Sequence, residues 1–171
     1  MTIEDVKAII QGDETRTLEV KKTTGELKDG MRSACAFLNT AGGWLFFGIA
    51  PITLKILGQE VTDSTRRDIA REVAKLEPLI DLPVEYIDEP DRPGCQVIAL
   101  HLDAPSYWDA PYTYDNKPYM RIESTTVVMP RDIFEDRLMR SKTNLHKWED
   151  QICEGITIAD LEELCIRGGV R

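Results

Sequence analysis

A five-residue break between two apolar segments constrains the fold of this chain more than any other feature. Residues 27–38 carry apolar side chains at the spacing of an amphipathic helix. Residues 39–43 (Asn-Thr-Ala-Gly-Gly) end that helix, because Asn and Gly tolerate left-handed backbone conformations. Residues 44–49 (Trp-Leu-Phe-Phe-Gly-Ile) are apolar on both faces, which is typical of a strand at the centre of a sheet. The sequence therefore predicts a helix that turns tightly into a central strand.

Apolar periodicity divides the rest of the chain into short helices and strands. Further helices are expected at 3–11, 62–76, from 130 onward and at 158–166. Further strands are expected at 17–21, 54–57, 83–87, 95–102, 112–114 and 118–122. Hairpins outnumber strand–helix–strand crossovers, so we expect an α/β fold of the α+β type, with a single mixed, mostly antiparallel sheet flanked by helices. One domain is expected over residues 1–140, and residues 141–171 form a helical tail or the first part of a further region.

The chain is acidic, with a formal net charge of −9. Proteins that bind phosphates usually cluster Lys and Arg, so this charge argues against tight nonspecific nucleic-acid binding, although a local basic face stays open. No apolar run approaches the ~20 residues of a membrane span. Residues 1–5 lack the basic-then-apolar pattern of a signal peptide. We therefore expect a cytoplasmic protein that makes no membrane contact.

Three segments carry a family resemblance. They are residues 14–21 (Glu-Thr-Arg-Thr-Leu-Glu-Val-Lys), residues 36–49 (Ala-Phe-Leu-Asn-Thr-Ala-Gly-Gly-Trp-Leu-Phe-Phe-Gly-Ile) and residues 118–126 (Pro-Tyr-Met-Arg-Ile-Glu-Ser-Thr-Thr). In this order and spacing the chain resembles the Schlafen AlbA_2 family. The resemblance implies a nucleic-acid-binding module of bacterial transcriptional regulators or helicase-related proteins, usually at the N-terminus of a longer protein.

Glu14, Glu19 and Lys21 form the set that favours catalysis. Glu19 and Lys21 project to the same face of a strand, and Glu14 precedes it. Two carboxylates and a lysine can hold Mg²⁺ or Mn²⁺ against a phosphodiester, which makes Glu14 and Glu19 the candidate metal ligands and all three the candidate nuclease residues. The resemblance implies a third acid after the following strand, but residues 49–57 contain none. We therefore favour binding over cleavage. The alternative is a solvated Glu19–Lys21 ion pair.

A second set favours contact with nucleic acid. Its members are basic or hydroxyl-bearing side chains that suit phosphate oxygens: Lys21, Lys22, Arg121, Ser124, Thr125 and Thr126. The alternative is a hairpin whose hydroxyl groups only cap a turn. Glu123 stands where the family pattern has glycine, and it places a negative charge beside these groups.

The helix-to-strand junction is expected to be structural. Its signature residues are Asn39, Gly42, Gly43 and Gly48. A functional alternative is a turn that presents backbone N–H groups to a ligand. The junction lies at a helix C-terminus, however, where the helix dipole repels phosphate. The sequence therefore does not predict a nucleotide-binding loop here.

Three hypotheses follow for function. The first is a nucleic-acid-binding module of a bacterial transcriptional regulator, with DNA favoured over RNA. The second is a Schlafen-type nuclease that depends on Mg²⁺ or Mn²⁺. The third is a protein-interaction or dimerisation module, for which a second copy of the chain is one candidate partner.

Overall fold

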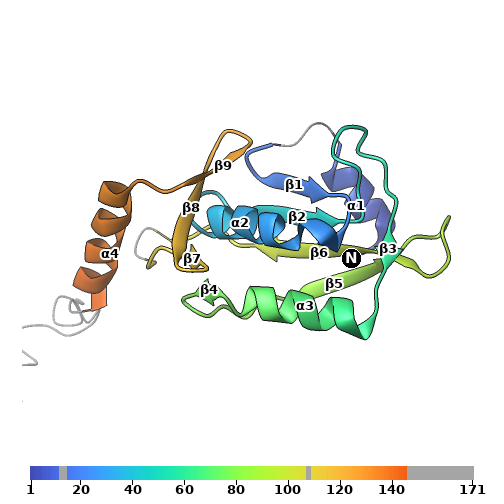
Figure 1. Cartoon of the computed structure of the whole chain (residues 1–171). Helices are drawn as coiled ribbons and strands as arrows, with labels where there is room; N and C mark the ends of the chain where they lie inside the picture. The colour runs from blue at the N-terminus through green and yellow to red at the C-terminus, as the bar shows by residue number, and fades with distance from the viewer. Residues whose placement is uncertain (12–14, 107–108, 146–171) are drawn as a thin grey trace, which may run out of the picture.

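The computed structural model describes residues 1–11, 15–106 and 109–145, which form a mixed α+β fold (Figure 1). The helices are α1 (Ile3–Ile9), α2 (Leu27–Leu38), α3 (Asp63–Val73) and α4 (Arg131–Leu145), with a 3₁₀ turn, η1 (Thr24–Glu26), before α2. The strands are β1 (Leu18–Lys21), β2 (Gly43–Phe47), β3 (Gln59–Glu60), β4 (Leu76–Glu77), β5 (Val84–Asp88), β6 (Cys95–Leu102), β7 (Thr113–Tyr114), β8 (Lys117–Ile122) and β9 (Thr125–Val128). The α+β class expected from the sequence is confirmed.

A five-stranded sheet forms the centre of the fold. β1 and β2 are parallel neighbours connected through α2, and β2 pairs antiparallel with β6. β6 also pairs antiparallel with β3 and β5. The sheet is therefore mixed and mostly antiparallel, as expected. β2 lies between β1 and β6, and its alternating side chains enter two apolar cores on opposite faces of the sheet, which explains why both of its faces are apolar.

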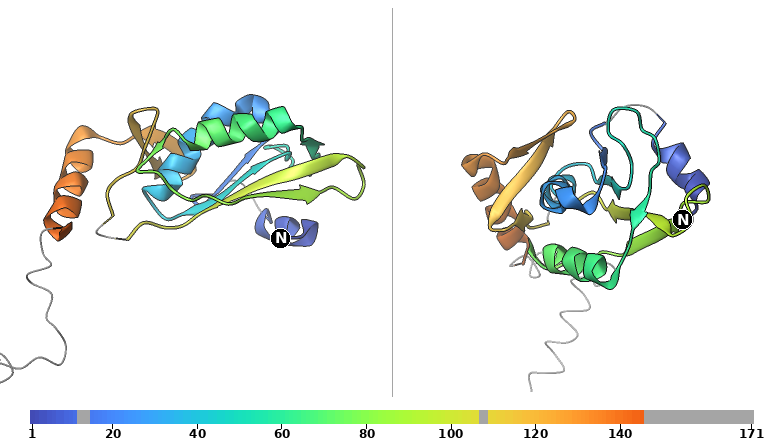
Figure 2. Two further views of the ribbon diagram at one scale, coloured as in Figure 1. Left: turned by 90° about the horizontal axis from the view of Figure 1, so that it is seen from below. Right: turned by 45° about the vertical axis from the view of Figure 1, so that its right-hand side comes forward.

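The remaining strands form a separate four-stranded sheet in the order β4-β7-β8-β9. The expectation of a single sheet is therefore wrong. Hairpin signals show which strands pair locally, but they do not show which helix or sheet edge the hairpins pack against. Here β7, β8 and β9 contact α2, so that this helix lies between the two sheets (Figure 2).

Each face of the five-stranded sheet has its own apolar core. One core contains residues of α2 and α3, and the other contains residues of α1. Leu18 and Val20 of β1 belong to the α1 core. Successive side chains of a strand point to opposite faces, so Glu19 and Lys21 are directed toward α2.

The junction between α2 and β2 depends on two glycines. Gly42 and Gly43 have φ angles of 69° and 152°. A Cβ atom on Gly43 would lie 2.4 Å from the carbonyl oxygen of Thr17, and one on Gly42 would lie 2.6 Å from the carbonyl oxygen of Leu102. The turn thus presses its backbone against neighbouring backbone where no side chain fits.

The segment after β2 differs from expectation. The strand expected over 54–57 is replaced by an isolated bridge between Ile49 and Ile56, and β3 begins later, at Gln59. Leu54 has a positive φ of 51°, which interrupts an extended conformation.

The C-terminal part is described as far as α4. This helix confirms the one expected from residue 130 onward, and it spans the boundary expected between residues 140 and 141. The division into domain and tail stays a prediction, because the helix expected at 158–166 lies outside the described residues. Within the described ranges, no helix combines the length and the apolar character that a membrane span requires.

Candidate functional site

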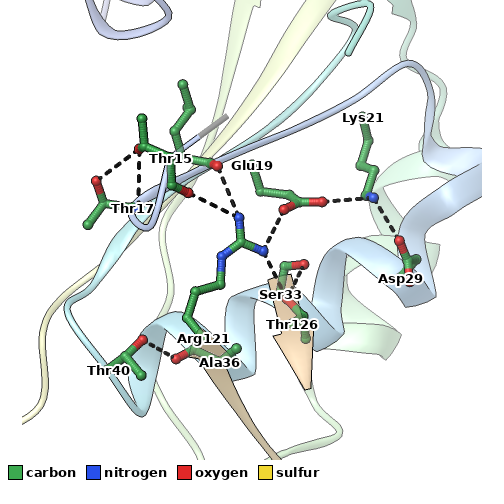
Figure 3. A network of polar contacts seen from close by, with 11 residues as sticks. Thr15, Thr17, Glu19, Lys21, Asp29, Ser33, Ala36, Thr40, Arg121 and Thr126 are labelled. Carbon is green, nitrogen blue, oxygen red and sulfur yellow. Dashed lines mark hydrogen bonds and ion pairs between the residues drawn. The ribbon is translucent and has the colours of Figure 1, made fainter. Parts of the chain in front are cut away.

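Four of the predicted site residues, Glu19, Lys21, Arg121 and Thr126, converge on a buried ion-pair network between β1, α2 and the β8–β9 hairpin (Figure 3). Glu19 is at its centre, with 6% of its surface exposed. One carboxylate oxygen, Oε2, lies 2.7 Å from Nη1 of Arg121, and the other, Oε1, lies 2.8 Å from Nζ of Lys21. The Glu19–Lys21 ion pair of the alternative is therefore present, but it is buried and not solvated, because the side chains are only 8% and 12% exposed.

Arg121 connects the hairpin to the segment around β1. Its Nη1 donates to Oγ1 of Thr126 at 2.9 Å, in addition to pairing with Glu19. Its Nη2 donates to the carbonyl oxygens of Thr15 and Leu18, each at 3.2 Å. The guanidinium also lies 4.9 Å from the centre of the Phe37 ring, and the residue is only 3% exposed. Both terminal nitrogens are therefore engaged within the protein.

Lys21 bridges two carboxylates. In addition to Glu19, its ammonium group lies 2.7 Å from Oδ2 of Asp29 on α2. Burial alone would lower the pKa of Lys21, but its hydrogen bonds to Asp29 and Glu19 outweigh burial and raise the pKa above its usual value. Lys21 therefore keeps its positive charge at any physiological pH.

The hydroxyl-bearing residues of the hairpin divide into two groups. Thr126 is half-buried, and its hydroxyl group lies 3.0 Å from that of Ser33 on α2. Ser124 and Thr125 are exposed, as is Lys22 on the segment that follows β1. Only these exposed groups can reach a macromolecular ligand without breaking the network.

Glu123 occupies the turn between β8 and β9 with a positive φ of 50°. This conformation favours glycine, because a Cβ crowds the backbone there. The glycine of the family pattern at this position thus has a backbone reason, independent of any ligand.

Two partners of the network, Asp29 and Ser33, belong to neither predicted set of site residues. They are four residues apart on α2 and therefore lie on one helical face. This spacing was visible in the sequence, but it does not show which strand the helical face covers.

Asn39 ends α2 and connects it to the second sheet. Its Nδ2 donates to the carbonyl oxygens of Tyr112 and Tyr119 at 2.8 and 2.9 Å, and its Oδ1 accepts from the backbone N–H of Tyr112 at 2.8 Å. The amide is therefore fully engaged with backbone groups, at a residue only 2% exposed.

The described residues do not fit a Mg²⁺ or Mn²⁺ site at Glu19. Such ions require several oxygen ligands, whereas cationic side chains engage both oxygens of this carboxylate. Within the described ranges, no group of three His, Cys, Asp or Glu could hold a metal ion. Glu14, the other expected ligand, lies outside the described residues. The described site therefore supports no metal-dependent step.

Known proteins similar to this chain include a family and solved structures of related fold. The model of the family described as "Schlafen, AlbA_2" matches residues 14–130. The crystal structure of the DIP2311 protein from Corynebacterium diphtheriae is similar with a TM-score of 0.50 and 18% sequence identity. That similarity covers 78% of this chain but only 31% of that protein, and at this identity it supports the fold alone. No curated protein matches the sequence.

Proposed function

The chain belongs to the Schlafen AlbA_2 family, and from this membership and the network around Glu19 we propose that it binds nucleic acid without cleaving it. DNA is the proposed ligand in preference to RNA, and the proposed setting is a bacterial transcriptional regulator. The observation that carries the proposal is the engagement of both Glu19 carboxylate oxygens by Arg121 and Lys21.

This pairing bears on the choice between binding and cleavage. Breaking a buried ion pair by removing one partner costs about 3–5 kcal/mol, because the remaining charge is left buried. A metal ion that recruited Glu19 would impose a similar cost on Arg121, which is buried beside it. The network therefore favours a structural role for Glu19, in which it holds the hairpin on β1.

The proposed contact surface consists of the exposed groups that flank this network. Lys22 follows Lys21 directly in the chain, and Ser124 and Thr125 precede Thr126. Lysine and hydroxyl groups are common partners of phosphate oxygens. In this proposal Lys21, Arg121 and Thr126 position the surface, and Lys22, Ser124 and Thr125 contact the ligand.

The proposal is tested by fluorescence anisotropy with labelled duplex DNA, single-stranded DNA and RNA over a range of salt concentrations. We expect log K to fall with log[salt], by about 0.9 for each duplex phosphate contacted. Lys22→Gln should weaken binding and reduce the magnitude of this slope by about 1. Lys7→Gln is the matched control, because Lys7 is also exposed but lies on α1, at the opposite face of the sheet. Its affinity should match that of the unmodified protein.

Two outcomes would overturn the proposal. A salt slope near zero, or no binding to any of the three ligands, would favour a protein-interaction module instead. Cleavage that depends on Mg²⁺ or Mn²⁺ and is lost in Glu19→Ala would show that the family's nuclease chemistry persists.

A further inference from the structure

A hollow of about 270 Å³ lies at the C-terminal end of α2. Three arginines from distant parts of the sequence line it: Arg16, which precedes β1, and Arg137 and Arg140 of α4. Thr40 and Ser106 add hydroxyl groups to the same lining. The hollow is distinct from the Glu19 network, and neither predicted set of site residues includes its arginines.

The three arginines differ in how far they are already engaged. Arg137 donates from Nη1 to the carbonyl oxygen of Asn39 at 2.6 Å, so a cation covers the negative end of the α2 dipole. Arg140 pairs with Asp136 one helical turn earlier. Arg16 is exposed, and the part of the chain that the structure describes gives it no hydrogen-bond or ion-pair partner.

One acidic residue, Asp109, lines the hollow as well. Its Oδ2 accepts the backbone N–H of Ser106 at 2.6 Å, so part of its hydrogen-bonding capacity is used within the loop. Asp136 already pairs with Arg140, so the three guanidinium groups meet two carboxylates and keep an excess of one positive charge. This local excess contrasts with the net charge of −9 for the whole chain.

We propose that this hollow binds a phosphate group of the nucleic acid, and this inference rests on the proposed function. A planar guanidinium presents paired N–H donors that match phosphate oxygens. The volume lies just below the range of about 300–1,000 Å³ typical of drug-sized ligands, and so suits a phosphate group better than a large ligand. The negative end of the α2 dipole disfavours phosphate at this junction. Arginines from elsewhere in the chain offset it with positive charge.

The hollow is also connected to the Glu19 network through the backbone. The carbonyl oxygen of Thr15 accepts a hydrogen bond from Arg121, and Thr15 directly precedes Arg16. The buried network thereby restrains the segment that presents the least engaged arginine. A phosphate group at Arg16 therefore meets a side chain whose backbone is already held in place.

The first test uses inorganic phosphate as the probe and the backbone amide resonances of Thr40 and Ser106 as reporters in NMR titrations. We expect saturable chemical-shift changes at both amides. Arg16→Gln should bind phosphate about tenfold more weakly, because it lacks one charge-assisted contact. Arg67→Gln is the matched control, because Arg67 is exposed on α3 and does not line the hollow. Absent shifts, or equal affinities in the two variants, would overturn the phosphate site.

The second test repeats the anisotropy measurements with oligonucleotides that carry or lack a 5′-phosphate. Weaker binding of both by Arg16→Gln supports an internal phosphodiester as the ligand, and weaker binding of the phosphorylated form alone supports a terminal phosphate. If DNA binds but Arg16→Gln behaves like Arg67→Gln, the inference fails while the proposed function stands. If phosphate binds in the hollow but no nucleic acid binds, the proposed function fails and the nucleic-acid source of the phosphate is overturned with it.

Discussion

Removal of the Glu19 carboxylate is the most direct perturbation of the buried network. In Glu19→Ala, Arg121 and Lys21 lose their shared partner at a site where the Glu19 side chain is 8% exposed. Breaking a buried pair in this way typically costs about 3–5 kcal/mol of the free energy of unfolding. Lys21 keeps Asp29, and Arg121 keeps Thr126 and two backbone carbonyls. We therefore expect a loss near the lower limit, about 3 kcal/mol.

The assay is urea unfolding at neutral pH, followed by tryptophan fluorescence and analysed by linear extrapolation. The slope with denaturant should stay unchanged, because the variant removes an interaction without changing the surface exposed on unfolding. Glu135→Ala is the matched control, since it breaks the Arg131–Glu135 pair on the surface of α4. Exposed helix pairs of this kind contribute about 0.3–0.5 kcal/mol.

A double-mutant cycle separates the Glu19–Arg121 interaction from other effects of each substitution. The cycle compares the single variants Glu19→Ala and Arg121→Ala with the double variant. It should give a coupling energy of at least about 1 kcal/mol, because the stability effects of substitutions at two contacting residues do not add. A loss below about 1 kcal/mol in Glu19→Ala, or a coupling energy near zero, would refute the claim that this pair holds the hairpin on β1.

Three further predictions concern the backbone and a buried thiol. Glu123→Gly should raise the free energy of unfolding by about 0.5–1 kcal/mol in the same urea assay, because it relieves a positive φ that disfavours a Cβ; a loss of stability would contradict this. Gly43→Ala should lower the free energy of unfolding by about 3 kcal/mol or more. Gly94→Ala should lower it by only about 1–2 kcal/mol, because Gly94 also has a positive φ but no atom lies within 4 Å of the position that a Cβ would take. Equal losses in the two variants would contradict the packing argument. Burial raises the pKa of Cys35 to about 12, so Cys35 should resist alkylation by iodoacetamide in the folded protein at pH 8. Peptide mass spectrometry should show that the half-buried Cys95 is modified faster. Because the folded-state pKa is raised, this thiol's contribution to stability is complete below its unfolded-state pKa of about 8.5 and declines as the pH rises toward 12.

Local patterns predicted the elements of this fold better than their assembly. The α2–β2 junction followed from its glycines and from the apolar character of residues 44–49, because backbone sterics and burial act over a few residues. The second sheet could not be predicted in the same way. Its strands come from residues 76–128, and their packing on α2 depends on contacts between distant segments.

The site shows the same division between local and distant effects. Strand alternation placed Glu19 and Lys21 on one face, and their ion pair agrees with that placement. Their burial depends on Arg121, which is about a hundred residues further along the chain. The distance in sequence left open whether Arg121 meets a ligand or the protein itself. The structure gives its terminal nitrogens internal partners, so its proposed role changes from phosphate contact to positioning.

The acidic composition and the arginine-lined hollow act at different length scales. At physiological ionic strength, exposed charges separated by more than about 8 Å are largely screened from one another. The net charge of −9 therefore opposes nonspecific attraction of a polyanion to the whole surface, but has little influence on a phosphate in contact with Arg16. A protein built in this way should depend on a few defined phosphate contacts, and a single arginine substitution should then remove a large share of its affinity. That dependence distinguishes a local site from a basic surface, on which the loss of one charge among many has a small effect.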